Sequence, residues 1–250
     1  MACPSKKKGY LLIIDNFRRK NSDQSKDVKD IIETFTELGF YPNYQENKSK
    51  EEIIEICKNI STDESLDNDY FVCIILAYTI DDELLAQMGD VRSEIEIEDI
   101  IDNFHSSVRF KDKKKLFFFQ TFVSTQKMKA TNYLESDASV DQDLKLLKNI
   151  KLERDLFFSF SRIYGNAVSI SDIHASGTLF FRTLCAILRI NKNKHMDICN
   201  ILTKVNNEIF STQKNKSREM SCFLSTLSGP LMLTADITDQ VPTVIINSLI

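Results

Sequence analysis

The side chains of this chain that could act as nucleophiles or hold a metal ion are its cysteines and histidines. There are six cysteines and three histidines among 250 residues. No two cysteines form a C-x-x-C pair, and most lie in apolar periodic stretches, where a thiol behaves as a small buried hydrophobic group. The histidines are too scattered to match the spacing of metal ligands. We therefore predict no metal site, no cofactor, reduced cysteines and surface histidines (Cys3, Cys57, Cys73, Cys185, Cys199, Cys222, His105, His174 and His195).

One strand end near the middle of the chain lies where an α/β enzyme would present a reactive group. Residues 113–124 read KKKLFFFQTFVS, which predicts a buried strand preceded by three lysines. Lysines that flank an apolar run commonly prevent edge pairing, and we interpret Lys113 to Lys115 in this way. The strand end presents Phe122, whose phenyl ring has no lone pair with which to attack a carbonyl carbon.

Strands and helices alternate along the first half of the chain. A capping box of Ser49 and Glu52 marks the start of one helix, and Gly39 suits the end of another. The alternation predicts an α/β fold, with a mostly parallel central sheet of about six strands and helices on both faces. Continuous apolar runs predict strands at 9–15, 70–78, 115–120 and 155–161, and stripes of period 3.6 predict helices around 28–38, 53–60, 100–104, 180–188 and 196–209.

The remaining segments are less regular. Residues 40–44 contain Pro42 and predict at best a short strand, and residues 220–233 predict one β-rich segment. Residues 124–154 are polar and charged with little periodicity, which predicts an exposed linker. The residues after 233 fit no predicted element. The length suits a single domain with one large core.

Composition and charge narrow the class of partner and the location. The net charge of −4 gives no reason to expect a nucleic acid or an anionic membrane as partner. The first residues carry no apolar core of a secretory signal. The longest apolar run, Tyr70 to Tyr78, is about half of the roughly 20 residues that span a bilayer. We therefore expect a cytoplasmic protein.

An ordered set of segments resembles the catalytic region of the caspase family. The segments are KGYLLIIDN, DVKDIIETFTELGF, SKEEIIEICKNIS, YFVCIILAY, KKKLFFFQ, DLFFSFS, FFRTLCAIL and MDICNILTKVNNEI. The resemblance implies a caspase-like three-layer α/β sandwich and a role in apoptosis. It also implies a division of the single domain into a large-subunit-like region (8–123), an intersubunit-type linker (124–154), a small-subunit-like region (155–233) and a C-terminal extension (234–250).

The residues that give caspases their chemistry are replaced in this chain. The family pairs a cysteine in the segment Gln-Ala-Cys-(Arg/Gln/Gly)-Gly with a histidine in Ser-His-Gly. The segment that resembles the first has Phe122 in place of the cysteine, and the segment that resembles the second contains Tyr78 and Thr79. Tyrosine ordinarily has a pKa near 10, which makes it a poor general base at neutral pH. The resemblance therefore implies a pseudoenzyme without peptidase activity.

The substrate-binding residues are also replaced. Caspases hold the substrate aspartate between two arginines and a glutamine, because a guanidinium group matches a carboxylate. Gln120 is kept, whereas Asn21 stands in place of the first arginine and Ile170, or Asp172 under a shifted alignment, in place of the second. The nearest arginines that could substitute for them are Arg18, Arg19 and Arg162.

What the resemblance leaves intact is a scaffold and a pairing strand. Residues 221–227 match the strand through which caspase units pair across a twofold axis. We expect it to bind an active caspase as a heterodimer and to regulate that caspase, with activation favoured over inhibition. The expected interface residues are Ser221, Cys222, Phe223, Leu224, Ser225, Thr226 and Leu227.

Three alternatives or additions stay open at this point. The chain could instead form a homodimeric interaction scaffold through the same strand. A peptidase with relocated groups would have to use Cys57, Cys73 or Ser124, yet Cys73 lies in the middle of a strand and is expected to be buried and inert. Cleavage by the partner is expected in the linker, after Asp137, Asp141 or Asp143.

Overall fold

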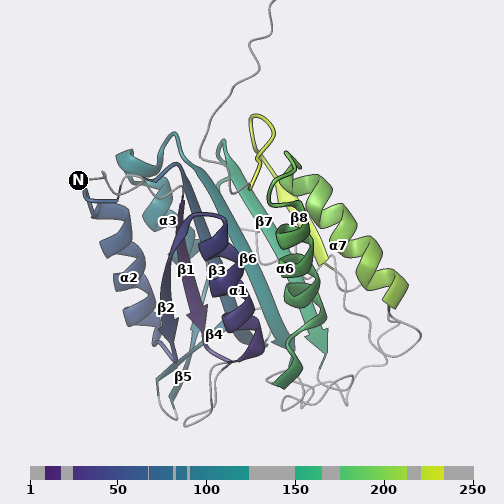
Figure 1. The fold of residues 1–250 in the computed structure, drawn as a ribbon. Coiled ribbons are helices and arrows are strands. Elements are labelled where there is room, and N and C mark those ends of the chain that lie inside the picture. Colours follow the sequence, from purple (N-terminus) through teal and green to yellow (C-terminus); the bar gives the residue numbers. More distant parts are fainter. Residues whose placement is uncertain are drawn as a thin grey trace, which may run out of the picture.

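In the computed structural model, six strands form one continuous sheet (Figure 1). The structure describes residues 9–17, 25–66, 68–80, 83–88, 91–123, 150–164, 175–212 and 221–233. The order of these strands is β2-β1-β3-β6-β7-β8, and all neighbours run parallel except β8, which is antiparallel to β7. The predicted mostly parallel sheet is confirmed. The bounds are β1 Gly9–Asp15, β2 Phe40–Glu46, β3 Tyr70–Ile80, β6 Lys114–Val123, β7 Leu156–Tyr164 and β8 Ser221–Ser225.

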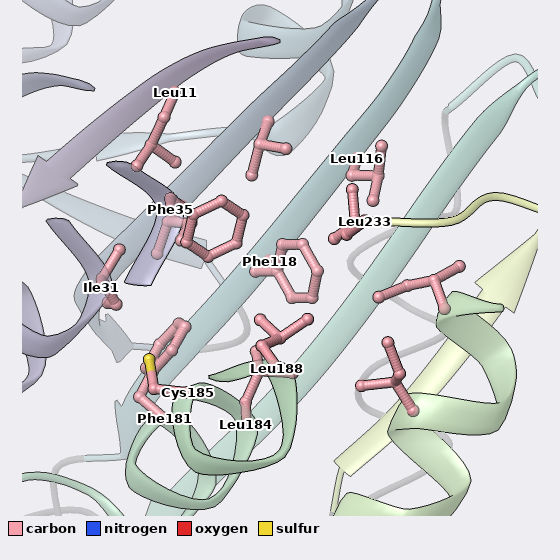
Figure 2. Packing of buried hydrophobic residues seen from close by; sticks show 14 of the residues in the cluster. Leu11, Ile31, Phe35, Leu116, Phe118, Phe181, Leu184, Cys185, Leu188 and Leu233 are labelled. Carbon is pink, nitrogen blue, oxygen red and sulfur yellow. The ribbon is translucent and has the colours of Figure 1, made fainter. Parts of the chain in front are cut away.

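Helices cover both faces of the sheet and give two hydrophobic cores. The first core lies under α1 (Lys26–Glu37), α6 (Leu179–Asn191) and α7 (Ile198–Thr212). The second core lies under α2 (Lys50–Thr62) and α3 (Ile97–His105). Figure 2 shows side chains of β1, β6, α1 and α6 meeting in the first core. The predicted three-layer sandwich is therefore confirmed, because successive strand residues alternate between the two cores.

Helix ends follow the predicted signals. The Ser49 side chain accepts a hydrogen bond from Glu52 N, and the Glu52 carboxylate accepts one from Ser49 N, which completes the capping box of α2. Gly39 follows α1 with a φ of 85°. Thr178 caps α6 through its hydroxyl, which accepts from Phe181 N at 3.2 Å.

A hairpin that the sequence did not predict follows β3. Strands β4 (Glu83–Met88) and β5 (Val91–Ile95) pair with each other, and β4 pairs with the end of β3. Leu84, Ala86 and Ile95 are its buried residues that extend the second core. The hairpin escaped prediction because its segments are short and its strands carry interspersed charges. Strand β2 also extends to Glu46, and as an outer strand it accommodates Pro42.

Of two basic residues expected at the surface, Lys115 is buried and His105 is partly buried. Lys115 is 1% exposed, and its Nζ donates to Phe110 O at 2.7 Å and to Lys113 O at 2.9 Å. Phe110 lies in a short 3-10 helix, Val108–Phe110, so the ammonium group stabilises the turn that leads into β6. The side chain of His105 is only 8% exposed, because α3 ends against the second core. The expectation of an exposed side chain was wrong at Lys115, whereas His105 is only partly exposed.

Other sequence predictions lie partly outside the described residues. The five cysteines within them are free, as predicted, whereas Cys3 and His174 lie outside. Most of the predicted linker, 124–149, and the C-terminal extension after residue 233 also lie outside, so the predicted domain division stays a prediction. Ile150, near the end of the predicted linker, packs in the second core. No helix within the described ranges is both long and apolar enough to cross a membrane.

Candidate functional site

The two positions that would hold the reactive groups lie side by side at one edge of the sheet. In parallel sheets, sites form where the carboxyl ends of neighbouring strands meet. Strands β3 and β6 are neighbours, and their register places Tyr78 directly opposite Phe122. Thr79 follows opposite Val123. The structure therefore brings together the two segments that the sequence had singled out separately.

Three aromatic rings fill this edge, and we name Phe17, Tyr78 and Phe122 the aromatic cluster. The ring of Phe17 lies 5.1 Å from that of Tyr78 and 6.2 Å from that of Phe122, both at 89°. The rings of Tyr78 and Phe122 lie 5.6 Å apart at 75°. Edge-to-face contacts of this kind are favourable, because the positive ring edge meets the negative ring face. Phe122 is only 6% exposed as a result.

Phe17 is the member of the cluster that the sequence did not reveal. It stands two residues beyond β1, and its backbone N–H donates to Asp15 Oδ1 at 3.1 Å. Asn16 fixes this segment, because its N–H donates to Leu76 O and its side chain exchanges two hydrogen bonds with the backbone of Lys48. An aromatic residue next to a strand end was the only signal in the sequence.

Gln120, which the sequence analysis assigned to the substrate site, is fully buried. Strand alternation places Gln120 and Phe122 on the face of the first core. Gln120 is fully buried, and its Nε2 donates to Ser161 O at 3.2 Å. Its Oε1 is buried without a hydrogen-bond partner among the described residues. The amide therefore bonds to the neighbouring strand inside the sheet, and no part of it reaches the surface.

Arg162 does not rebuild a carboxylate site with Gln120. It pairs with Thr121, so it starts from the face of the second core, opposite Gln120 and Phe122. It is also only 4% exposed. The other predicted positions of the aspartate-binding site lie outside the described residues: Arg18, Arg19, Asn21, Ile170 and Asp172.

The thiolate form of four cysteines is disfavoured by their surroundings. Burial raises the pKa of the Cys57 and Cys185 thiols to about 12 and that of Cys73 well above its ordinary value. Burial also raises the pKa of Cys199, on α7. Because a thiolate is the reactive form, the raised pKa disfavours nucleophilic chemistry at these four side chains. Within the described part of the chain, no group of three histidine, cysteine or acidic side chains could hold a metal ion.

Neither described histidine lies at the carboxyl edge of the sheet. Helix α6 starts at that edge, next to α1, where Thr178 N donates to both carboxylate oxygens of Asp27 at 2.9 and 3.0 Å. It then runs back, so His195 in the following loop lies towards the opposite edge. His105 ends α3, which leads into the start of β6 at the same opposite edge. Neither imidazole is therefore placed to share a proton with a group at position 122.

The predicted interface segment forms the outer strand beyond β7. Thr226 N donates to Leu156 O at 2.9 Å, and the strand register is regular, so the backbone groups of Phe223 and Ser225 point away from β7. The Phe223 ring stacks on Phe157 at 5.6 Å. The segment thus presents outward backbone groups on a well-packed strand. The predicted cleavage positions Asp137, Asp141 and Asp143 lie outside the described residues.

Comparison with known proteins identifies the family. Caspase-3 of Oryctolagus cuniculus is 25% identical over 240 residues, which cover 89% of this chain and 83% of that protein. Caspase-3 of Xenopus laevis is 27% identical over 232 residues, covering 88% and 78%. Caspase-8 of Mus musculus is 26% identical over 239 residues, covering 86% and 49%. The model of the caspase domain matches residues 8–232, and the chain therefore belongs to the caspase family.

Proposed function

We propose that this chain is a catalytically inactive caspase homologue that regulates an active caspase in apoptosis by forming a heterodimer with it. The observation that carries the proposal is the aromatic cluster at the carboxyl edge of the sheet. Caspase chemistry requires a thiolate and an imidazole close enough to share a proton. Here the two facing positions hold Phe122 and Tyr78 in ring contact.

The loss of substrate binding is supported by a separate argument, on the described part of the substrate site. Recognition of an aspartate side chain needs charged donors that reach the carboxylate in a fixed geometry. Gln120 is buried and bonded to Ser161 O, and Arg162 starts from the other face of the sheet. Among the described residues, neither a dyad nor a carboxylate-binding set forms at this edge, which supports a pseudoenzyme over a peptidase with altered specificity.

A regulatory role is supported by what the fold preserves. The chain keeps the caspase sheet, and β8 presents outward backbone groups at its outer edge. Such an edge pairs readily with another strand. A partner that binds the active conformation of a caspase better than the inactive one shifts it towards activity, with a coupling of about 1–3 kcal/mol. We favour activation over inhibition, because a chain without a substrate pocket orders its partner's loops without competing for substrate.

Size-exclusion chromatography and peptidase assays test this proposal together. The purified chain is run alone and mixed with active caspases, and the hydrolysis of aspartyl peptides by each mixture is recorded. We expect a mixed dimer and a higher rate than the caspase gives alone. A shift of this chain alone to twice its mass, without a mixed species, would favour the homodimeric scaffold. No complex and no change of rate with any caspase would refute the proposal.

A variant pair at Ser225 tests whether β8 forms the interface. Ser225→Pro removes an N–H that points away from β7, so it blocks the outer edge without breaking the bonds to β7. Ser225→Ala removes only the hydroxyl group and serves as the matched control. We expect the proline variant to lose the mixed dimer and the alanine variant to keep it. Equal dimer formation by both variants would place the interface elsewhere.

Processing by the partner and cytoplasmic location complete the proposal. We expect the active caspase to cleave after Asp137, Asp141 or Asp143, because it recognises aspartate. Mass spectrometry of the chain after incubation with the caspase checks this, and three intact bonds would refute it. Location in the cytoplasm agrees with the free thiols of the described cysteines, since reducing compartments keep cysteines unpaired.

A further inference from the structure

Asn206 of α7 occupies one end of the outer edge of β8. Its Nδ2 donates to Ser221 O at 2.8 Å, and its Oδ1 accepts from Ser221 N at 3.3 Å and from Ser221 Oγ at 2.6 Å. Ser221 belongs to the same outward-pointing set as Phe223 and Ser225, since the three alternate along the strand. One side-chain amide therefore makes the two backbone hydrogen bonds that a partner strand would otherwise make at Ser221.

The helix that carries Asn206 follows the edge of β8. Cys199 and Asn206 lie on one face of α7, and both contact β8, Cys199 through Ser225 and Asn206 through Ser221. Phe210 is one turn further on the same face and is 76% exposed. Figure 1 shows α7 beside β8 at the outer side of the sheet. Helix α7 is held on the sheet by its buried residues, which keep the face with Cys199 and Asn206 next to β8. These buried residues are Ile198, Ile201, Leu202, Val205 and Ile209.

The backbone groups of Phe223 and Ser225 are left for a partner. No hydrogen bond between described residues engages their outward N–H or C=O groups. An antiparallel strand that pairs with both residues makes two backbone hydrogen bonds at each of them. The two residues flank Leu224, so pairing about this residue uses every open group. Pairing that is shifted towards Ser221 would first have to displace the Asn206 side chain.

We propose that Asn206 caps the edge of β8 and thereby sets the register in which a partner caspase pairs with this chain. The partner's edge strand pairs antiparallel with Phe223 to Ser225, about an axis at Leu224. This inference rests on the proposed function for the identity of the partner. The cap itself is a property of the isolated chain and is tested without any caspase.

Amide hydrogen exchange of the isolated chain, followed by NMR at a concentration where it is monomeric, tests the cap. We expect slow exchange at Ser221 and fast exchange at Phe223 and Ser225. Asn206→Ala is expected to make the Ser221 amide exchange as fast as that of Phe223, whereas Asn207→Ala, an exposed neighbour of the same type, leaves it slow. Asn206→Asp keeps the acceptor and is expected to keep the protection of Ser221, which distinguishes lost capping from unfolding. Slow exchange at Phe223 and Ser225 in the monomer would refute the open edge.

Binding of a strand tests the register. The probes are a synthetic peptide with the sequence of residues 221–227 and the active caspases, each added to the chain and to both alanine variants. We expect either probe to protect the amides of Phe223 and Ser225, and Asn206→Ala to bind on the order of tenfold more tightly because Ser221 then joins the pairing. Weaker binding by Asn206→Ala than by Asn207→Ala would overturn the inference. It would mean that Asn206 stabilises β8 for pairing.

The two probes separate this inference from the proposed function. Protection by the peptide without protection by any caspase would retain the cap and its register and reject the caspase partner. Absence of protection at Phe223 and Ser225 by both probes would reject the pairing edge itself. A third outcome concerns the unmodified chain with a bound probe. If the probe there displaces the Asn206 side chain and pairs with Ser221 itself, the cap does not set the register.

Discussion

Placing a thiol and an imidazole at the two facing positions is expected to give a reactive thiol and still no peptidase. The change is the double variant Phe122→Cys with Tyr78→His. The two positions face each other in the register of β3 and β6, and their present rings lie 5.6 Å apart. A thiol and an imidazole at these positions are therefore near enough to interact. The scaffold around them stays as it is.

The cost to stability follows from the packing of Phe122. The removal of a buried phenyl ring costs about 3–5 kcal/mol where the site cannot collapse. Phe122 is 6% exposed and contacts two other rings, and the introduced thiol keeps part of its volume. We expect a loss of about 3 kcal/mol, less than the 5–15 kcal/mol that typically stabilises a domain. Urea denaturation measures this loss and shows whether the variant is folded.

Two assays separate nucleophile chemistry from substrate binding. Alkylation by iodoacetamide is expected to be faster in the double variant than in Phe122→Cys alone, because the imidazole favours the thiolate. Hydrolysis of aspartyl peptides is expected to stay undetectable in both, since Gln120 is buried and Arg162 starts from the opposite face. Turnover by the double variant would refute this reasoning, as would turnover by the unmodified chain that disappears when Tyr78 or Phe122 is changed.

Two further predictions concern stability and have matched controls. Gly9→Ala is expected to lower the free energy of unfolding by about 1–3 kcal/mol through overpacking, because the new Cβ would lie 2.1 Å from the Phe40 ring. The control is Gly229→Ala, whose new Cβ would have no atom within 4 Å, and we expect it to change stability by less than about 0.5 kcal/mol. Urea denaturation measures both. Burial lowers the pKa of His105 below its ordinary value. Below about pH 6.5 the unfolded chain therefore binds more protons than the folded chain. The free energy of unfolding falls as the pH falls, until the pH has passed the pKa of His105 in the folded chain. We expect His105→Asn to remove this slope in urea midpoints recorded between about pH 7.5 and 5, and the exposed His195→Asn to retain it.

The pairing of Tyr78 with Phe122 could be anticipated from the sequence, whereas the closure of the site could not. Two continuous apolar runs predict parallel strands, and parallel strands end at a common edge, which places the residues after them together. The third ring depends on Asn16, whose hydrogen bonds reach Leu76 and Lys48. No periodic pattern in the sequence encodes hydrogen bonds between distant segments. The sequence therefore did not predict that Phe17 joins Tyr78 and Phe122.

The fate of Arg162 shows a second limit of the sequence. The sequence separation between Arg162 and Gln120 does not determine on which face of the sheet the Arg162 side chain lies. The face follows only from the register between β6 and β7, which sets Thr121 opposite Arg162, and a shift by one residue would move the side chain to the other face. Lys115 is a similar case, because its burial depends on carbonyl groups of the turn at Phe110 and Lys113.

The aromatic cluster and the outer strand β8 are connected through β7. Phe122 lies opposite Ile163 of β7, and Ser221 of β8 lies opposite Ser161 of the same strand. Polar groups arranged for catalysis commonly lower stability, and their replacement by packed side chains stabilises a fold. The aromatic cluster fills the end of β6, whose neighbour is β7, with packed rings in place of a charged dyad. Because β8 takes its place from β7, we expect the pairing edge of this chain to be formed before any partner or ligand binds.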